Sequence, residues 1–267
     1  MSKDDVSTKQ TPAASSKLLK RHSDSEPFDN HFDYRSVIGK LNYLEKCTRL
    51  DISYAVHQCA RFASDPKKEH GQAVKWICRY LAGTKDKGVI LKPNTEQSFE
   101  VYCDSDFAGN WDKEESGDPD TARSRAGYII MYAGCPVFWA SKLSTLIALS
   151  TCEAEYQSLS MALRDTIPIM ELTREFRDRG FDIKTTIPTV HCRVFEDNTG
   201  ALEIATIHKV RPRTKHLNVM LHHFRQYVDQ GDIEVKAIRS EFQISDMLTH
   251  ANDVQTLQRH RRKAMGW

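Results

Sequence analysis

The order of strand and helix patterns after Val89 constrains the fold of this chain more than any other feature of its sequence. Apolar and polar residues alternate over residues 99–104, which is the two-residue period of a strand with one buried face. Two more strand patterns follow at 127–133 and 137–140, and a helical pattern begins at about Ser150 with the spacing of a capping box. Strand and helix patterns then alternate. This order predicts an α/β domain with a mixed sheet.

The later patterns bring the number of expected strands to five. Strands are expected at 190–195 and 233–239, with a short helix and then a helix at about 215–230 between them. The last predicted helix contains Met247 and Leu248.

The segments outside this domain differ from it in composition. Residues 1–27 are polar with almost nothing to bury, so we expect a disordered tail. Residues 28–88 hold three helical patterns and no cluster of catalytic type, which predicts a helical accessory segment. Residues 89–252 then make up the α/β domain, and residues 253–267 are expected to form a basic tail.

Composition sets the broad class of the protein. Hydrophobic residues make up 40% and charged residues 28% of the chain, which is typical of a globular protein with a core. The net charge is only +2, so a surface for nucleic acid would have to come from local clusters of charge. The seven cysteines form no CxxC pair, which favours reduced thiols in the cytosol or nucleus over a zinc site. No apolar run is long enough to cross a bilayer, so we expect no membrane partner.

Four acidic residues lie where an α/β sheet gathers side chains from distant parts of the chain. Asp104 and Asp197 end the first and fourth strands, Glu155 lies in the first turn of the long helix, and Asp246 opens the last helix. Converging carboxylates repel one another, so such a site favours a divalent cation such as Mg²⁺. Two ions about 4 Å apart could activate a water and stabilise the leaving oxygen of a phosphodiester. Acids are also common on surfaces and in helix first turns, so placement alone leaves a purely structural role open.

Two of these positions have an acidic neighbour that competes for the same role. Strand alternation puts Asp104 with the polar face, and we prefer it over Asp106, which is expected to shape the following turn. We prefer Glu155 over Glu153, because Glu153 has the spacing of a capping residue.

The short motifs around the four acids are more specific than the acids themselves. They read Tyr-Cys-Asp-Ser-Asp-Phe-Ala-Gly from Tyr102, Leu-Ser-Thr-Cys-Glu-Ala-Glu-Tyr from Leu149, Glu-Asp-Asn-Thr-Gly-Ala from Glu196 and Ser-Asp-Met-Leu-Thr-His from Ser245. This ordered set resembles the active-site motifs of the C-terminal ribonuclease H domain of copia-type retrotransposon Pol polyproteins. Segments 34–39 and 47–56 resemble the part of the same polyproteins that connects the polymerase to this domain.

The resemblance implies a ribonuclease H-like fold and hydrolysis of the RNA strand of RNA–DNA hybrids. It implies that the catalytic residues are Asp104, Glu155, Asp197 and Asp246. The same four residues would hold two Mg²⁺ ions, for which Mn²⁺ could substitute. The expected partners are the hybrid and the rest of a retroelement polymerase acting in trans. The expected location is the cytoplasm, in a virus-like particle, or the nucleus.

The densest basic stretch, at 208–216, lies between the third and fourth acids. We expect it to hold hybrid phosphates, because Lys and Arg dominate phosphate binding; the alternative is a solvated loop. The residues concerned are Lys209, Arg211, Arg213, Lys215 and His216. His250, four residues after Asp246, could shuttle protons or be an ordinary surface histidine.

Several features depart from the family pattern. Leu50 replaces the usual proline of Thr-Arg-Pro-Asp, the insertion 111–125 is longer and more acidic than expected, and the Tyr-x-Asp-Asp motif of a polymerase is missing. We therefore expect no reverse transcriptase activity, whether this is a fragment of a decayed element or a separated terminal piece. The alternative to a ribonuclease H is an inactive remnant that binds nucleic acid or a protein partner. An integrase is disfavoured, because the acids occur in the order Asp, Glu, Asp, Asp.

Overall fold

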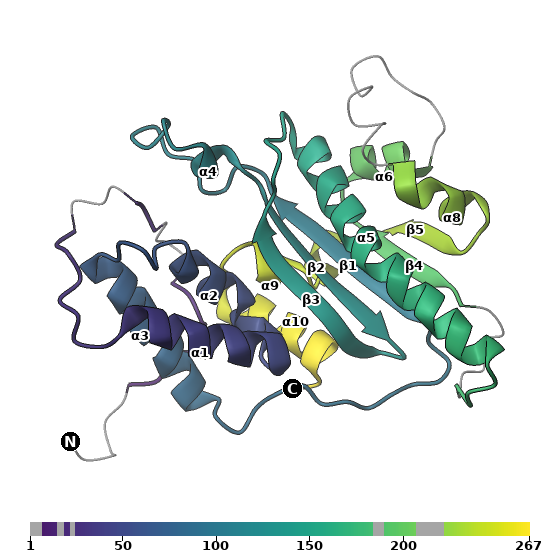
Figure 1. The fold of residues 1–267 in the computed structure, drawn as a ribbon, viewed down its shortest axis with the longest axis horizontal. Helices are drawn as coiled ribbons and strands as arrows, with labels where there is room; N and C mark the ends of the chain where they lie inside the picture. Colours follow the sequence, from purple (N-terminus) through teal and green to yellow (C-terminus); the bar gives the residue numbers. More distant parts are fainter. Residues whose placement is uncertain (1–6, 15–18, 22–24, 184–189, 207–221) are drawn as a thin grey trace.

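A five-stranded sheet forms the centre of the molecule (Figure 1). This computed structural model describes residues 7–14, 19–21, 25–183, 190–206 and 222–267. The strands are β1 Phe99–Asp106, β2 Arg125–Tyr132, β3 Cys135–Leu143, β4 Cys192–Glu196 and β5 Ile233–Ala237. Their order is β3-β2-β1-β4-β5; the first three are antiparallel, β4 is parallel to β1, and β5 is parallel to β4. The predicted α/β class and the mixed five-stranded sheet are confirmed.

Helices cover both faces of this sheet (Figure 1). The helices before the sheet are α1 Tyr34–Cys47, α2 Ser53–Ala60 and α3 Lys68–Gly83. The later ones are α4 Pro119–Ala122, α5 Thr151–Asp178, α6 Thr199–Thr206, α8 Arg225–Asp229, α9 Asp246–Thr249 and α10 Val254–Met265. One face packs against α5, α6 and α8, and the other packs against α1–α3, α9 and α10.

The alternation of side chains along β1 assigns its residues to these two faces. Val101 and Cys103 are buried in the core beneath α5, whereas Tyr102 belongs to the core on the opposite face. Asp104 has the same parity as Tyr102, so it projects from the face that α9 covers. The candidate site therefore lies at the carboxyl end of β1, just beyond the apolar core.

The helices before the sheet share a core with it. Ile52, Val56 and Ile77 pack in one apolar cluster with sheet residues Ile129 and Trp139. The indole Nε1 of Trp139 also donates a hydrogen bond of 3.1 Å to the backbone oxygen of Glu45 in α1. Residues 28–88 thus contain the helices α1–α3, and these pack directly on the sheet.

Residues 253–267, expected to form a basic tail, instead contain α10. Its N-cap Asp253 accepts hydrogen bonds from two backbone N–H groups of the first turn, and Leu257 and Met265 are buried. Arg261 is only 7% exposed and donates a 2.6 Å hydrogen bond to the hydroxyl of Tyr80 in α3. The basic composition concealed this helix, because part of its buried face is a paired arginine.

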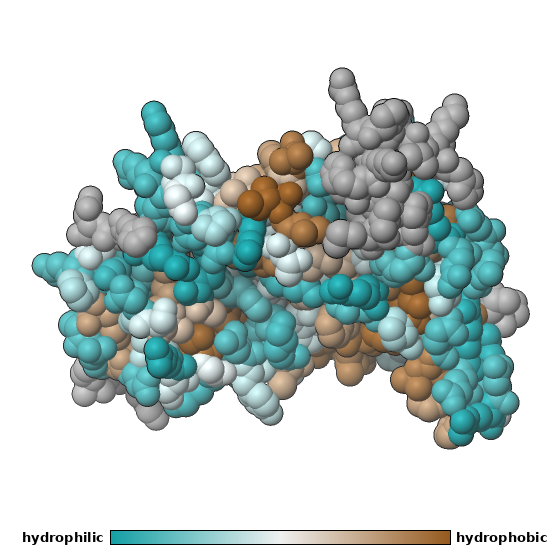
Figure 2. Space-filling view, turned by 45° about the horizontal axis from the view of Figure 1, so that its top comes forward, coloured by the Kyte–Doolittle hydropathy of each residue, from teal (hydrophilic) through white to brown (hydrophobic). Residues whose placement is uncertain are grey.

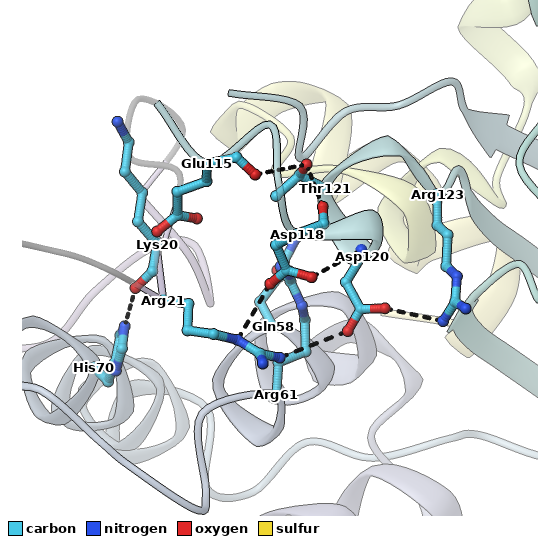
Figure 3. A network of polar contacts seen from close by, with 10 residues as sticks. All are labelled: Lys20, Arg21, Gln58, Arg61, His70, Glu115, Asp118, Asp120, Thr121 and Arg123. Carbon is cyan, nitrogen blue, oxygen red and sulfur yellow. Dashed lines mark hydrogen bonds and ion pairs between the residues drawn. The ribbon is translucent and has the colours of Figure 1, made fainter. Parts of the chain in front are cut away.

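The N-terminal segment contacts both α3 and the acidic insertion that precedes β2. The indole of Trp76 donates to the backbone oxygen of Thr11 at 2.8 Å, although residues 1–27 were expected to be disordered. Arg21 forms ion pairs with Asp118 at 3.2 Å and with Asp120 at 3.6 Å, both in the insertion (Figure 3). Surface ion pairs of this kind contribute about 0–1 kcal/mol each.

Two expectations fall partly or wholly outside the described residues. The basic stretch with Lys209, Arg211, Arg213, Lys215 and His216 lies outside them, as does the first part of the helix expected at 215–230. The rest of that expected helix consists of a short 3-10 turn, His222–Phe224, followed by α8. Within the described ranges, no helix combines the length and the apolar character needed to cross a lipid bilayer.

Candidate active site

Asp104 lies near the end of β1, opposite Gly127 of β2, and only 8% of it is exposed. Its carboxylate accepts a hydrogen bond from the hydroxyl of Thr249 in α9. This contact requires a glycine at position 127, because a Cβ there would lie 2.6 Å from the methyl carbon of Thr249. From the other face of the sheet, the hydroxyl of Ser158 in α5 donates to the backbone oxygen of Asp104 at 2.8 Å. Asp104 is thus fixed by helices on both faces.

Glu153 and Glu155 both lie in the first turns of α5, but their carboxylates have different surroundings. The Ser150 hydroxyl accepts from the backbone N–H of Glu153, and the Glu153 carboxylate accepts from the backbone N–H of Leu149 at 3.0 Å. Glu153 therefore folds back onto the start of the helix, as its capping spacing predicted. Glu155 instead faces the end of β1, where its Oε2 atom is buried with no hydrogen-bond partner among the described residues.

Asp197 immediately follows β4 and is held from two sides. Its Oδ2 atom accepts a 2.6 Å hydrogen bond from the hydroxyl of Ser240. The next residue, Asn198, caps α6 through a 3.0 Å hydrogen bond from the backbone N–H of Ala201 to its side-chain oxygen. The turn that presents Asp197 is therefore fixed by the start of the helix after it.

Three of the four predicted acids come together at this edge of the sheet. Among the described residues, Asp104, Glu155 and Asp197 each offer a carboxylate oxygen within 4.8 Å of the others. Asp246 lies outside this group of three, at the start of α9. Its charge is nevertheless among those that raise the pKa of Glu155, so it belongs to the same electrostatic environment.

Burial and mutual repulsion raise the pKa values of these carboxyl groups. Burial, followed by the charges of Asp104 and other nearby acids, raises the pKa of Glu155 to about 11. Burial raises the pKa of Asp104 to about 6 and that of Asp246 to about 8. Without a cation, the fully ionised cluster is thus unfavourable.

The donor set fits a hard divalent cation. Clustered carboxylate oxygens are the ligands that Mg²⁺ and Mn²⁺ accept, and the unpaired Oε2 of Glu155 is a free ligand atom. A bound cation would favour the ionised forms that burial and repulsion disfavour.

A fifth carboxylate, missed from the sequence, lies beside the three. Glu196 is 1% exposed, and burial raises its pKa to about 8. Its Oε1 accepts the backbone N–H of Asn198 at 3.0 Å, and its Oε2 lies 3.6 Å from the sulfur of Cys103. Burial alternates along β4, with Cys192, Val194 and Glu196 inside, so strand alternation was the available signal.

Asp106 and His250 lie next to the cluster. Burial raises the pKa of Asp106, whereas the charges of His250 and Arg125 lower it. The charge of His250 also lowers the pKa of Asp104, so this histidine is near both acids. Asp106 is outside the group of three, which agrees with our preference for Asp104.

The connection between β3 and α5 presents apolar side chains to solvent at this end of the sheet. Leu146, Ile147 and Leu149 are exposed, Leu149 by 79%. The connection is anchored by the Ser144 hydroxyl, which donates to the side chain of Gln157 at 2.7 Å. Figure 2 shows apolar surface gathered at the edge that carries this connection in Figure 1.

No protein-family model matches this chain. The chain is 35% identical over 239 residues to the retrovirus-related Pol polyprotein from transposon RE1 of Arabidopsis thaliana, which covers 90% of this chain. It is 35% identical over 216 residues, or 81% of this chain, to the polyprotein from transposon TNT 1-94 of Nicotiana tabacum.

Among solved structures, LC11-RNase H1 in complex with an RNA/DNA hybrid aligns with 57% of this chain and 93% of its own, with a TM-score of 0.37 and 15% identity. The chain spans about 15% of the length of the two curated polyproteins. Within that span, the similarity to them extends over most of the chain. Copia-type retrotransposon Pol polyproteins are therefore homologues of this chain.

Proposed function

We propose that this chain is a metal-dependent endonuclease that hydrolyses the RNA strand of RNA–DNA hybrids. The observation that carries the proposal is the convergence of Asp104, Glu155 and Asp197, which come from three separate elements and are brought within 4.8 Å of one another. Similarity to Pol polyproteins supports the same proposal, because the acids stand in motifs that resemble the ribonuclease H motifs of that family.

The role of the acids is to hold divalent cations. Asp104, Glu155 and Asp197 would provide the ligands, and Asp246 would add negative charge or a further ligand at the start of α9. When bound, two Mg²⁺ or Mn²⁺ ions supply an activated water and charge stabilisation at the leaving oxygen of the phosphodiester. The hydroxyls of Thr249 and Ser240 orient the carboxylates of Asp104 and Asp197.

The proposed substrate is the hybrid, with the RNA strand as the strand that is cut. Only RNA carries the 2′-hydroxyl by which a site can distinguish the two strands. Affinity for the hybrid is expected to come mainly from basic side chains that meet phosphates, and to weaken as salt is added. The basic stretch 208–216 remains the proposed phosphate-binding segment.

The substitution Asp197→Asn tests this proposal, because it keeps the shape of the side chain and removes its charge. We expect cleavage of a labelled hybrid in Mg²⁺ to fall by orders of magnitude, while binding in chelator changes little. Asp178→Asn is the matched control, since Asp178 is exposed at the far end of α5. Duplex DNA should be spared by every variant, and chelator should abolish cleavage.

Two outcomes would count against the proposal. Equal cleavage by the wild type and by Asp197→Asn would show that Asp197 is not a catalytic residue. A folded wild type that binds the hybrid in Mg²⁺ or Mn²⁺ but never cuts it would favour the inactive remnant that binds nucleic acid.

A further inference from the structure

The pairing between β1 and β4 ends just before Asp104 and Asp197. β1 and β4 pair in parallel from Phe99 opposite Cys192 to Tyr102 opposite Phe195, where the pairing ends. Asp104 and Asp197 stand two residues further along the chain, Asp104 still within β1 and Asp197 just after β4. Their separation is therefore set by something other than the regular hydrogen bonds of the sheet.

Gln243 bridges the two strands at the point where they part. Its side-chain nitrogen donates to the backbone oxygen of Cys103 in β1 at 2.8 Å and to that of Phe195 in β4 at 3.2 Å. An amide nitrogen has two N–H groups, and each is used on one strand. The side-chain oxygen of Gln243 accepts from the hydroxyl of Ser245 at 2.9 Å, which fixes the orientation of the amide.

The same segment also contacts the two carboxylates. We name residues 240–249 the clip. At its start, the hydroxyl of Ser240 donates to Asp197 at 2.6 Å, and at its end the hydroxyl of Thr249 donates to Asp104. Gln243 lies between these two contacts and is fully buried, so the clip fixes both backbones and both side chains.

We propose that Gln243 is a positioning residue that sets the separation of Asp104 and Asp197, and through it the affinity of the carboxylate cluster for divalent cations. This inference rests on the proposed function only in assigning cations to the cluster. Mg²⁺ requires near-ideal octahedral geometry, so a small displacement of one strand end weakens its binding. Residues that orient metal ligands typically change metal affinity by about 10–100-fold when they are substituted.

The chain offers a closely matched control. Gln58 in α2 is also buried, its side-chain nitrogen donates to Asn110 at 2.9 Å and to Tyr54 at 3.2 Å, and its oxygen accepts from Arg61. The substitutions Gln243→Met and Gln58→Met therefore each remove three hydrogen bonds made by a buried side chain. Only Gln243→Met removes hydrogen bonds to β1 and β4, the strands that lead to Asp104 and Asp197.

The experiment measures Mn²⁺ binding to the full chain by calorimetry without nucleic acid, beside the melting temperature in chelator. We expect Gln243→Met to weaken Mn²⁺ binding by about tenfold or more. Gln58→Met should bind Mn²⁺ as the wild type does, even if it lowers the melting temperature as much as Gln243→Met does. At saturating Mg²⁺ the KM for the hybrid should be unchanged in Gln243→Met, whereas the Mg²⁺ concentration for half-maximal cleavage should rise.

Thr249→Val provides a second variant should Gln243→Met fail to fold, because it removes one hydroxyl of the clip and keeps the side-chain shape. It should also weaken Mn²⁺ binding. A folded Gln243→Met, or in its absence Thr249→Val, with wild-type Mn²⁺ affinity would overturn this inference alone. A folded wild type that binds no Mn²⁺ would overturn the proposed function as well.

Discussion

The fold strongly disfavours the ionisation of Glu155. Burial and neighbouring acids raise its pKa from 4.5 to about 11. Below pH 4.5 the carboxyl is protonated in the folded and unfolded chains alike, so it does not affect stability. Above that pH the unfolded chain ionises first, and the folded state loses stability as the pH rises toward the folded pKa.

Glu155→Gln should therefore stabilise the metal-free protein in a pH-dependent way. In chelator at pH 8 we expect its melting temperature to exceed that of the wild type by about 5 °C, and the difference to vanish near pH 4.5. Calorimetry across this pH range measures it, with the exposed Glu171→Gln on the same helix as control. A difference that does not change with pH would contradict the assigned cause.

Residues differ in how far the sequence alone could place them. Asp104 and Asp197 could be predicted because each lies close to the end of a strand and stands in a recognisable motif. Glu196 was accessible only through the alternation of a short strand, which is a weak signal. Gln243 was not predictable, because its role depends on where two strands distant in sequence stop pairing.

At the scale of elements, the close approach of α9 to β2 is what brings Thr249 to Asp104. Gly127→Ala would place a Cβ 2.6 Å from the Thr249 methyl carbon and 2.9 Å from the Cβ of Leu248. Overpacking of this kind typically costs about 1–3 kcal/mol.

We therefore expect Gly127→Ala to lower the melting temperature and to weaken Mn²⁺ binding together, because α9 carries part of the clip. Gly39→Ala in α1 is the control, since a Cβ there meets no described atom within 4 Å. It should be neutral or stabilising, because alanine favours a helix over glycine. An unchanged melting temperature in Gly127→Ala would contradict this prediction, because it would show that α9 can shift without a loss of stability.

Elements with regular apolar patterns were predicted more successfully than those without. The long helix was expected at about 150–179 and is observed as α5, Thr151–Asp178, because its cap and its apolar face are both visible in the sequence. α10 was missed because its buried face includes Arg261 and His260 besides its apolar residues. The burial of a charged side chain depends on distant partners such as Tyr80, which local patterning does not reveal.

At the scale of the whole molecule, the helices before the sheet and the last helix fill one face together. Tyr80 of α3 joins them, because its hydroxyl accepts from Arg261 of α10 and donates to Asp51 at 2.5 Å. Without α1–α3, the sheet residues Ile129 and Trp139 would lose much of their cover. The α/β domain is therefore not expected to be independent of the segment before it.

A protein restricted to residues 89–267 should be poorly soluble or lack a cooperative thermal transition, whereas the full chain should unfold in one transition. Circular dichroism and calorimetry on the two proteins test this. A soluble 89–267 protein with a sharp transition would show that the shared core is dispensable.

The shared core also has a consequence for the timing of folding during synthesis. Ribosomes add about 5–20 residues per second, so roughly ten seconds separate the synthesis of β3 from that of α10. Throughout that interval the sheet face that α10 covers remains partly open to water. The nascent chain therefore exposes apolar surface during this interval, and we expect the yield of folded protein to depend on the speed of translation beyond β3.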